Sequence, residues 1–144
     1  MRYNLDLKKV FPKSKSVGKR SWGKEDLLVL IPKVLTLKKI LIKKGKMGGL
    51  QYHRKKNECG ILISGKLKIK FVNSKNKLIS KVLKKGDTFH FPPNFIHQEI
   101  AITNCTIIEA STPHFNDRMR VEKRFKVKNF AGLPSTKLKD IVFR

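Results

Sequence analysis

Apolar and polar residues alternate along much of this chain with a period of two, which is the pattern of half-buried β-strands. The alternation is clearest in residues 66–71, where Leu67, Ile69 and Phe71 are expected on one side and the lysines on the other. Further runs of this kind, separated by turn residues, predict strands at residues 27–31, 34–42, 50–53, 59–63, 78–83, 89–91, 95–100 and 106–110. Many short strands with little helical periodicity predict an all-β protein, either an antiparallel sandwich or a barrel.

The two ends of the chain depart from this pattern. Residues 1–23 are polar and basic, and we expect an irregular arm or an edge strand there. Residues 126–144 form a C-terminal extension, in which a short helix is predicted from Ser135, whose hydroxyl can cap it, with Leu138 among the residues placed to dock. A chain of 144 residues is large enough for one core, so a single domain is expected.

The composition is strongly basic, with 34 Lys and Arg against 10 Asp and Glu and a formal net charge of +24. The lysines are spread evenly, arginine is much scarcer, and no nucleic-acid-binding motif occurs, so nucleic acid is not the expected partner. A basic field would still attract a small anionic substrate such as a sugar phosphate. Whether the charge has a purpose beyond solubility stays open at this point.

The cysteines and the apolar runs say little about chemistry. Cys59 and Cys105 are far apart in apolar, strand-like contexts, so both are expected to be small buried hydrophobic residues. No apolar run approaches membrane-spanning length, and the N-terminus lacks the hydrophobic region of a signal peptide. We therefore expect a soluble cytoplasmic protein without a membrane partner.

One spaced set of residues points to a metal site. Gln51 and His53 are two apart and so share one face of a strand, and Glu58 opens the next strand. His97 comes from a third strand. Two imidazoles, a carboxylate and an amide oxygen suit one divalent ion, Zn²⁺ first, with Mn²⁺, Fe²⁺ and Ni²⁺ also compatible. The alternative is that these are ordinary strand histidines and a surface acid, but turn residues at matching offsets favour the metal site.

Two motifs resemble those of the cupin family. They read Gly45-x5-Gln51-x-His53-x4-Glu58-x6-Gly65 and Gly86-x5-Pro92-x-Asn94-x2-His97. Asn94 stands where the family usually has Gly, and Asn is the next best residue at positive φ. The resemblance implies a cupin jelly-roll barrel over roughly residues 24–125, with the four candidate ligands at one metal ion, and it implies a homodimer.

A narrower similarity is to the C-terminal cupin domain of type II phosphomannose isomerases. It rests on Ser21-Trp22-Gly23, Leu50-Gln51-x-His53 and Asp117-x2-Arg120-x-Glu122-x-Arg124-Phe125. It implies a metal-dependent sugar-phosphate aldose–ketose isomerase. Other activities remain open on the same residues: another metal cupin enzyme, such as an epimerase, lyase or dioxygenase, or a small-ligand-binding cupin that is not an enzyme.

Five further residues are candidates for the reaction or for the substrate, each with a structural alternative. Glu99 is two residues beyond the second-motif histidine, so it shares that strand face and is either a general base or a structural carboxylate. Lys56 stands where the isomerases have Arg, and either meets a phosphate or enediolate or lies at the surface. Arg120 and Arg124 are phosphate candidates or paired surface charges. Glu109, on an apolar strand, is a candidate to line the substrate site.

Overall fold

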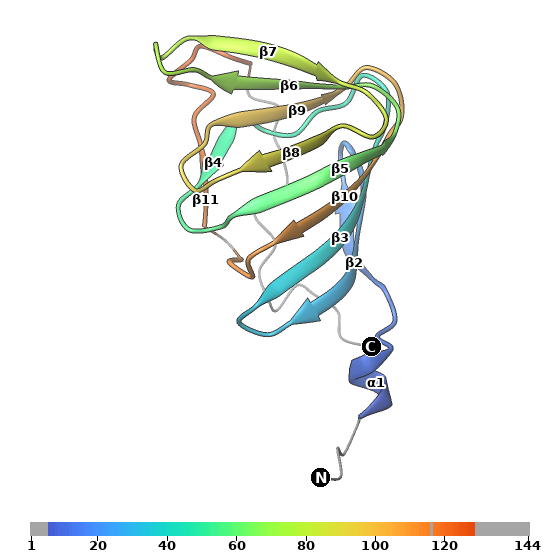
Figure 1. Ribbon diagram of the computed structural model, residues 1–144. Coiled ribbons are helices and arrows are strands. Elements are labelled where there is room, and N and C mark those ends of the chain that lie inside the picture. Colours follow the sequence, from blue (N-terminus) through green and yellow to red (C-terminus); the bar gives the residue numbers. More distant parts are fainter. Residues whose placement is uncertain (1–5, 116, 129–144) are drawn as a thin grey trace.

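The computed structural model of the chain describes residues 6–115 and 117–128, and over these it is almost entirely β-structure (Figure 1). A four-residue helix, α1 (Leu7–Val10), is followed by eleven strands in the described residues. They are β1 (Lys15–Arg20), β2 (Gly23–Ile31), β3 (Leu35–Ile42), β4 (Gln51–His53), β5 (Glu58–Ser64), β6 (Leu67–Val72), β7 (Leu78–Leu83), β8 (Thr88–Phe91), β9 (His97–Ala101), β10 (Cys105–Ser111) and β11 (Arg118–Arg120). The expected all-β fold class is confirmed.

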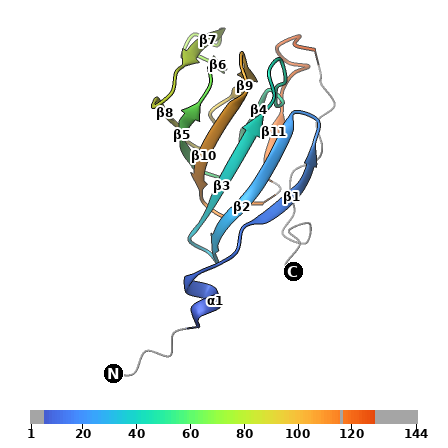
Figure 2. The ribbon, with the colours of Figure 1, turned by 90° about the vertical axis from the view of Figure 1, so that its right-hand side faces the viewer.

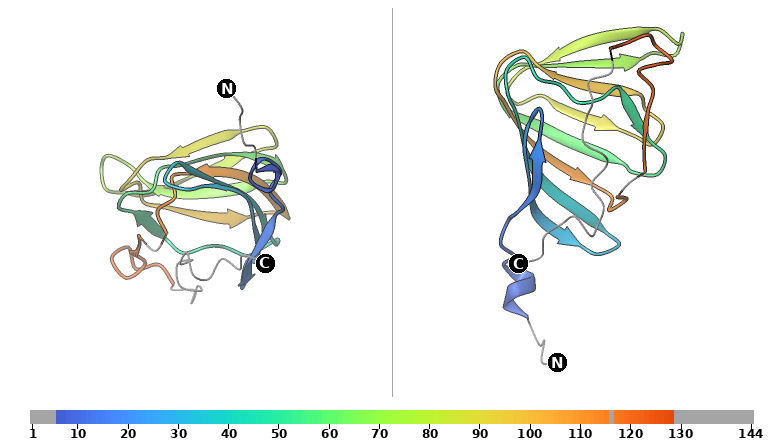
Figure 3. Two further views of the ribbon diagram at one scale, coloured as in Figure 1. Left: turned by 90° about the horizontal axis from the view of Figure 1, so that it is seen from below. Right: turned by 180° about the vertical axis from the view of Figure 1, so that it is seen from behind.

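The strands form two antiparallel sheets that face each other as layers (Figures 2 and 3). One sheet has the strand order β1-β2-β3-β10-β5-β8 and the other β11-β4-β9-β6-β7. Strands distant in sequence are neighbours, such as β3 beside β10 and β4 beside β9, as in a jelly roll. The two sheets are not joined by strand pairing into a closed barrel, so the arrangement within the described residues is a sandwich.

The strands predicted from alternation are all present, with ends shifted by a few residues. In the N-terminal segment, Lys15–Arg20 forms β1 at the edge of the first sheet, and α1 projects away from the sandwich (Figure 1). The pattern did not predict α1 or β11, because each is too short to show a period. The helix predicted from Ser135 lies outside the described residues.

One end of the space between the sheets is apolar. Leu67 and Ile69 of β6 are buried there and Phe71 packs against them, which confirms the predicted alternation. The other core residues are Ile40, Ile42, Leu62, Leu83, Phe91, Ala101, Cys105 and Ile107. Cys105 is buried as expected, but the expectation for Cys59 was wrong: it is exposed, because it lies on the outer face of β5 between the inward-facing positions 58 and 60.

The other end of this space, which we call the polar end, is lined by charged and hydroxyl side chains. The strand register places Glu109 of β10 opposite Lys38 of β3, and Ser111 opposite Thr36 on one side and Glu58 on the other. All five are buried. A buried charge has to be paired or held by hydrogen bonds, so this end is where chemistry is expected.

Left-handed backbone positions shape turns at both ends of the sandwich. Asn94 has φ 68°, which confirms the expectation that asparagine replaces glycine at a positive φ before β9. Gly65 has φ 93°, and a Cβ there would lie 2.2 Å from the carbonyl oxygen of Asn104.

None of the helices in the described residues is long and apolar enough to span a membrane.

Candidate metal centre

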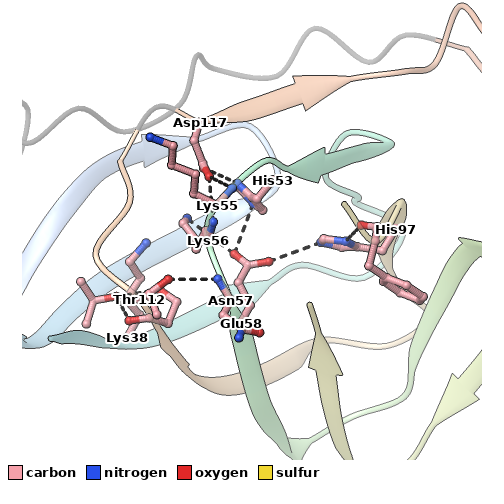
Figure 4. A network of polar contacts seen from close by, with 12 residues as sticks. Lys38, His53, Lys55, Lys56, Asn57, Glu58, His97, Thr112 and Asp117 are labelled. Atoms are coloured by element: carbon pink, nitrogen blue, oxygen red, sulfur yellow. Dashed lines mark hydrogen bonds and ion pairs between the residues drawn. The ribbon is translucent and has the colours of Figure 1, made fainter. Parts of the chain in front are cut away.

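The four predicted ligands come together at the polar end, from three strands. Gln51 and His53 are the ends of β4, Glu58 begins β5, and His97 begins β9 directly opposite Gln51. The Glu58 carboxylate lies between the two imidazoles (Figure 4). Nε2 of His53 is 3.3 Å from Oε1 of Glu58, and Nε2 of His97 is 3.6 Å from Oε2. Side-chain exposure is 8% for His53 and Glu58 and 5% for His97, so the group is largely withdrawn from water.

Asp117 holds His53 from behind, a contact that the sequence did not predict. The Nδ1–H of His53 donates to Oδ1 of Asp117 at 2.8 Å (Figure 4). Oδ2 of Asp117 accepts the backbone N–H groups of Lys55 and Lys56, also at 2.8 Å each. Since Nδ1 carries the proton in this arrangement, Nε2 presents its lone pair to the interior, as a metal-ligating histidine does.

His97 is oriented in the same way by the backbone. Its Nδ1–H donates to the carbonyl oxygen of Phe95 at 3.0 Å, and its ring stacks on Phe91 at 4.1 Å between centroids. Gln51 contributes a different signal: its Oε1 is buried and has no hydrogen-bond partner in the described residues. An acceptor buried in this way destabilises a fold by about 1–3 kcal/mol, so a ligand that uses it would remove that cost.

Burial and neighbouring charges shift the pKa values of the acids in opposite directions. Burial opposes ionisation of Glu58, but the neighbouring His53 ring and the Lys56 ammonium outweigh it and lower its pKa to about 2. Burial lowers the pKa of His97, which keeps it neutral. Burial raises the pKa of Glu99 to about 8, with the charges of Glu58 and Glu25 acting in the same direction. The polar end therefore holds a carboxylate that stays ionised and a carboxyl that loses its proton only near pH 8.

The structure places three of the other candidates at the polar end. Nζ of Lys56 is 3.5 Å from Oε1 of Glu58 and the side chain is 12% exposed, so it is not a solvated surface lysine. Oε1 of Glu99 is buried without a hydrogen-bond partner in the described residues. Glu109 is buried beside Lys38, and burial raises its pKa well above the ordinary value, with Glu58 adding to the effect.

The two candidate arginines are placed differently. Arg120 forms an ion pair with Glu122, and Oε1 of Glu122 also accepts the backbone N–H of Leu50 at 3.2 Å. This contact fixes the segment that leads into β4. Arg124 is exposed and donates to Oδ1 of Asn76 at 3.5 Å, and the structure does not bring it to the buried group.

Sequence reasoning missed a buried ion pair on the inner face of the larger sheet. Nζ of Lys38 is 2.8 Å from Oε1 of Glu25, and Oε2 of Glu25 accepts from Nε of Arg20 at 3.1 Å. The signal was present in the pattern. Lys38 and Ile40 are two residues apart on β3 and both point inward, so a charged residue occupies a position where an apolar one is expected.

The donors fit a divalent ion. Neutral imidazoles, a carboxylate and an amide oxygen are ligands for Zn²⁺ and its neighbours in the first transition series, and both histidines have the outer hydrogen bonds that ligands need. No three His, Cys, Asp or Glu side chains of residues 6–115 and 117–128 already form a finished ligand cluster.

Comparison with known proteins identifies the family. The Cupin family matches residues 19–134, which is most of the chain. The chain belongs to the cupin family. This membership accounts for the two-sheet architecture and for the two sequence motifs that meet at the polar end of the cupin sandwich.

Individual relatives are more distant from this cupin. Germin-like protein subfamily 2 member 1 of Arabidopsis thaliana is 42% identical over 45 residues, which are 31% of this chain and 20% of that protein. CapF of Staphylococcus aureus, a capsular polysaccharide assembling protein, superposes with a TM-score of 0.63 at 20% identity, over 69% of this chain and 30% of its own. KdgF from Halomonas sp. has a TM-score of 0.55 at 17% identity, over 65% of this chain and 80% of its own. These structural likenesses show the shared fold. This chain spans less than a third of the length of the germin-like protein and of CapF.

Proposed function

We propose that this cupin binds one divalent metal ion through Gln51, His53, Glu58 and His97 and acts as a sugar-phosphate aldose–ketose isomerase. The observation that supports it most is that the Nε2 atoms of two buried histidines face the two oxygens of one buried carboxylate. Ligand atoms at about 2.0–2.2 Å from one ion are roughly 3.0–3.6 Å from each other. The distances of 3.3 and 3.6 Å fall in this range.

Aldose–ketose isomerisation needs a group that moves a proton between neighbouring carbons. A divalent ion, when bound, supplies a Lewis acid that polarises the sugar carbonyl oxygen. Glu99 is on the same face of β9 as His97 and has a buried oxygen without a partner in the described residues. We assign it the transfer: its ionised form, populated as the pH approaches about 8, takes the proton from C2 of the aldose and returns it to C1, while the C2 hydroxyl proton moves to the oxygen at C1. No electrons are gained or lost overall.

Lys56 is the group we assign to the anionic part of the substrate. Its ammonium is at the polar end beside Glu58, where it can hold the negative oxygen of the enediolate or a phosphate oxygen. The basic surface adds a field that attracts anions toward the protein. The similarity of the Gln51, His53, Glu58 and Asp117 motifs to type II phosphomannose isomerases supports mannose 6-phosphate as the first substrate to test.

The first experiment is metal analysis of protein purified without a histidine tag. We expect about one divalent ion per chain in the wild type and none in His53→Ala, because His53 supplies a ligand that cannot be replaced by water alone. His114→Ala is the matched control, since His114 is exposed in a loop, and it should keep its metal. Absence of metal from the wild type, with none taken up on reconstitution, would contradict the metal-dependent function.

The second experiment follows the reaction itself. Mannose 6-phosphate in deuterated water should exchange its C2 proton in the presence of the protein, and Glu99→Gln should slow the exchange by about a hundredfold or more. Asp87→Asn, which changes a surface carboxylate in a turn, should not. If no exchange occurs with the Zn²⁺, Mn²⁺, Fe²⁺, Co²⁺ and Ni²⁺ forms, the isomerase assignment is wrong. Oxygen consumption by the Fe²⁺ form alone would instead assign an oxygenase.

A further inference from the structure

Two buried ionisable residues on the inner face of the larger sheet are not used by the metal centre or by the proton transfer. Lys38 of β3 and Glu109 of β10 are directly opposite each other in the strand register. They are 5% and 7% exposed, so the ammonium and the carboxyl group are both enclosed between the sheets. We refer to these two residues as the Lys38–Glu109 pair.

Lys38 has unused hydrogen-bonding capacity. Its ammonium donates to Oε1 of Glu25 at 2.8 Å, which is its one hydrogen bond in the described residues. Glu25 is held in turn by Nε of Arg20 at 3.1 Å on its other oxygen, so the position of the ammonium is fixed from behind. An ammonium carries three donors, so two of those on Lys38 have no acceptor among the described residues.

Glu109 has the complementary property. Its carboxyl group makes no hydrogen bond with any other residue of the described part of the chain, although it is buried. It is also opposite Gly60 of β5, which is two residues after Glu58 and on the same strand face. The Lys38–Glu109 pair and the Glu58 carboxylate therefore border the same interior space, and the charge of Lys38 is felt by both acids.

The geometry points to a function for this pair: Lys38 and Glu109 bind neighbouring hydroxyl groups of a polyhydroxylated substrate whose reacting end lies at the His53–Glu58–His97 group. The Lys38 ammonium can donate a hydrogen bond to the oxygen of one hydroxyl group, and a carboxyl oxygen of Glu109 can accept a hydrogen bond from the next. The pair therefore offers both a donor and an acceptor to a sugar. An apolar ligand would leave the buried groups without partners, which is strongly unfavourable. This inference takes its ligand class, a sugar phosphate, from the proposed function.

The test separates a binding role from a purely structural one. Affinities of the full chain for mannose 6-phosphate and for inorganic phosphate are measured by calorimetry in the wild type, Lys38→Met and Glu109→Gln. Lys39→Met is the matched control, because Lys39 is the next residue and is exposed on the opposite face of β3. If Lys38→Met fails to fold, the double variant Glu25→Gln/Lys38→Met is used in its place, because it removes both charges of the ion pair.

We expect the wild type to bind mannose 6-phosphate at least about tenfold more tightly than inorganic phosphate. Lys38→Met and Glu109→Gln should each weaken sugar-phosphate binding about tenfold or more, because each replaces a buried group that hydrogen-bonds a substrate hydroxyl. Their affinity for inorganic phosphate should change less than about twofold, because the hydroxyl contacts are absent. Lys39→Met should match the wild type for both probes.

The inference is overturned if Lys38→Met and Glu109→Gln bind mannose 6-phosphate as the wild type does, or if the wild type does not prefer it to inorganic phosphate. Failure of the proposed function is distinguishable. C2 exchange with an unchanged KM in Glu109→Gln would refute the hydroxyl contacts and keep the isomerase. Selective binding through Lys38 and Glu109 without any C2 exchange would keep the contacts and refute the isomerase.

Discussion

Replacing Asp117 by alanine should reduce both the stability of the fold and its affinity for a metal ion. The Asp117 carboxylate is the single acceptor for three donors, the ring of His53 and the backbone N–H groups of Lys55 and Lys56, each at 2.8 Å. It thereby ties the segment before β11 to the turn between β4 and β5. No other side chain among the described residues holds Nδ1 of His53.

The size of the effect follows from the burial of each donor. The His53 ring is buried, so loss of its charged acceptor should destabilise the fold by about 2 kcal/mol. The two amides lie in a part-buried turn and can regain water, so each contributes roughly 0.5 kcal/mol. We expect a total loss of about 3 kcal/mol of unfolding free energy. Metal affinity should fall about 10- to 100-fold, as for other outer-shell partners of a metal-binding histidine.

Urea unfolding of the metal-free protein measures the first effect, and zinc calorimetry of the folded protein measures the second. Asp87→Ala is the control, because Asp87 accepts one backbone N–H, that of Lys84, in an exposed turn. It should lose less than about 1 kcal/mol and bind zinc normally. If Asp117→Ala resembles Asp87→Ala in both measurements, the assignment of Asp117 as the group that positions His53 is refuted.

Three further predictions concern acid stability, a turn and the metal. Burial opposes ionisation of Glu25, but neighbouring charges, Lys38 first among them, lower its pKa below the ordinary value. The ionised Glu25 therefore stabilises the fold fully above the ordinary pKa of a glutamate, and this stabilisation is lost as the pH falls through the lowered pKa. Wild-type unfolding free energy should therefore drop more steeply below about pH 4.5 than that of Glu25→Gln, and parallel curves would contradict this. Gly65→Ala should destabilise by about 2 kcal/mol or more in urea, because its φ is 93° and its Cβ would strike Asn104, whereas Gly48→Ala, with open space, should be near neutral. Zinc at about 100 times its Kd should raise the unfolding free energy by about 2.7 kcal/mol in a thermal melt, and a melt unaffected by zinc or chelator would speak against the site.

The charge of the chain has a structural counterpart. Of the acids in the described residues, Glu25, Glu58, Glu109, Asp117 and Glu122 are buried. Folding therefore removes these acids from the surface and leaves most of the lysines there. Composition gave the net charge of +24, but the burial of the acids with most lysines left outside is a result of the fold.

The sequence predicted the candidate ligands because their signal is local. Gln51 and His53 share a strand face by period alone, and the turn residues fix where Glu58 and His97 begin their strands. Asp117 gave no local signal. Its partners, His53 and the turn at residues 55–56, are more than sixty positions away, and only the pairing of β11 with β4 brings them together.

The sequence by itself determined that this protein is all-β, where most strands lie, which faces they bury and which residues are the candidate metal ligands. All of these depend on a side-chain period of two and on turn residues, which act over a few positions. The tertiary structure alone decided which charges meet. Lys38, Glu25 and Glu109 come from three strands. Lys56 and Arg120 were both phosphate candidates from the sequence, and the structure places Lys56 beside Glu58 and pairs Arg120 with Glu122. The physical reason is that strand order and register in a jelly roll join distant segments, and no pattern along the chain encodes that pairing directly.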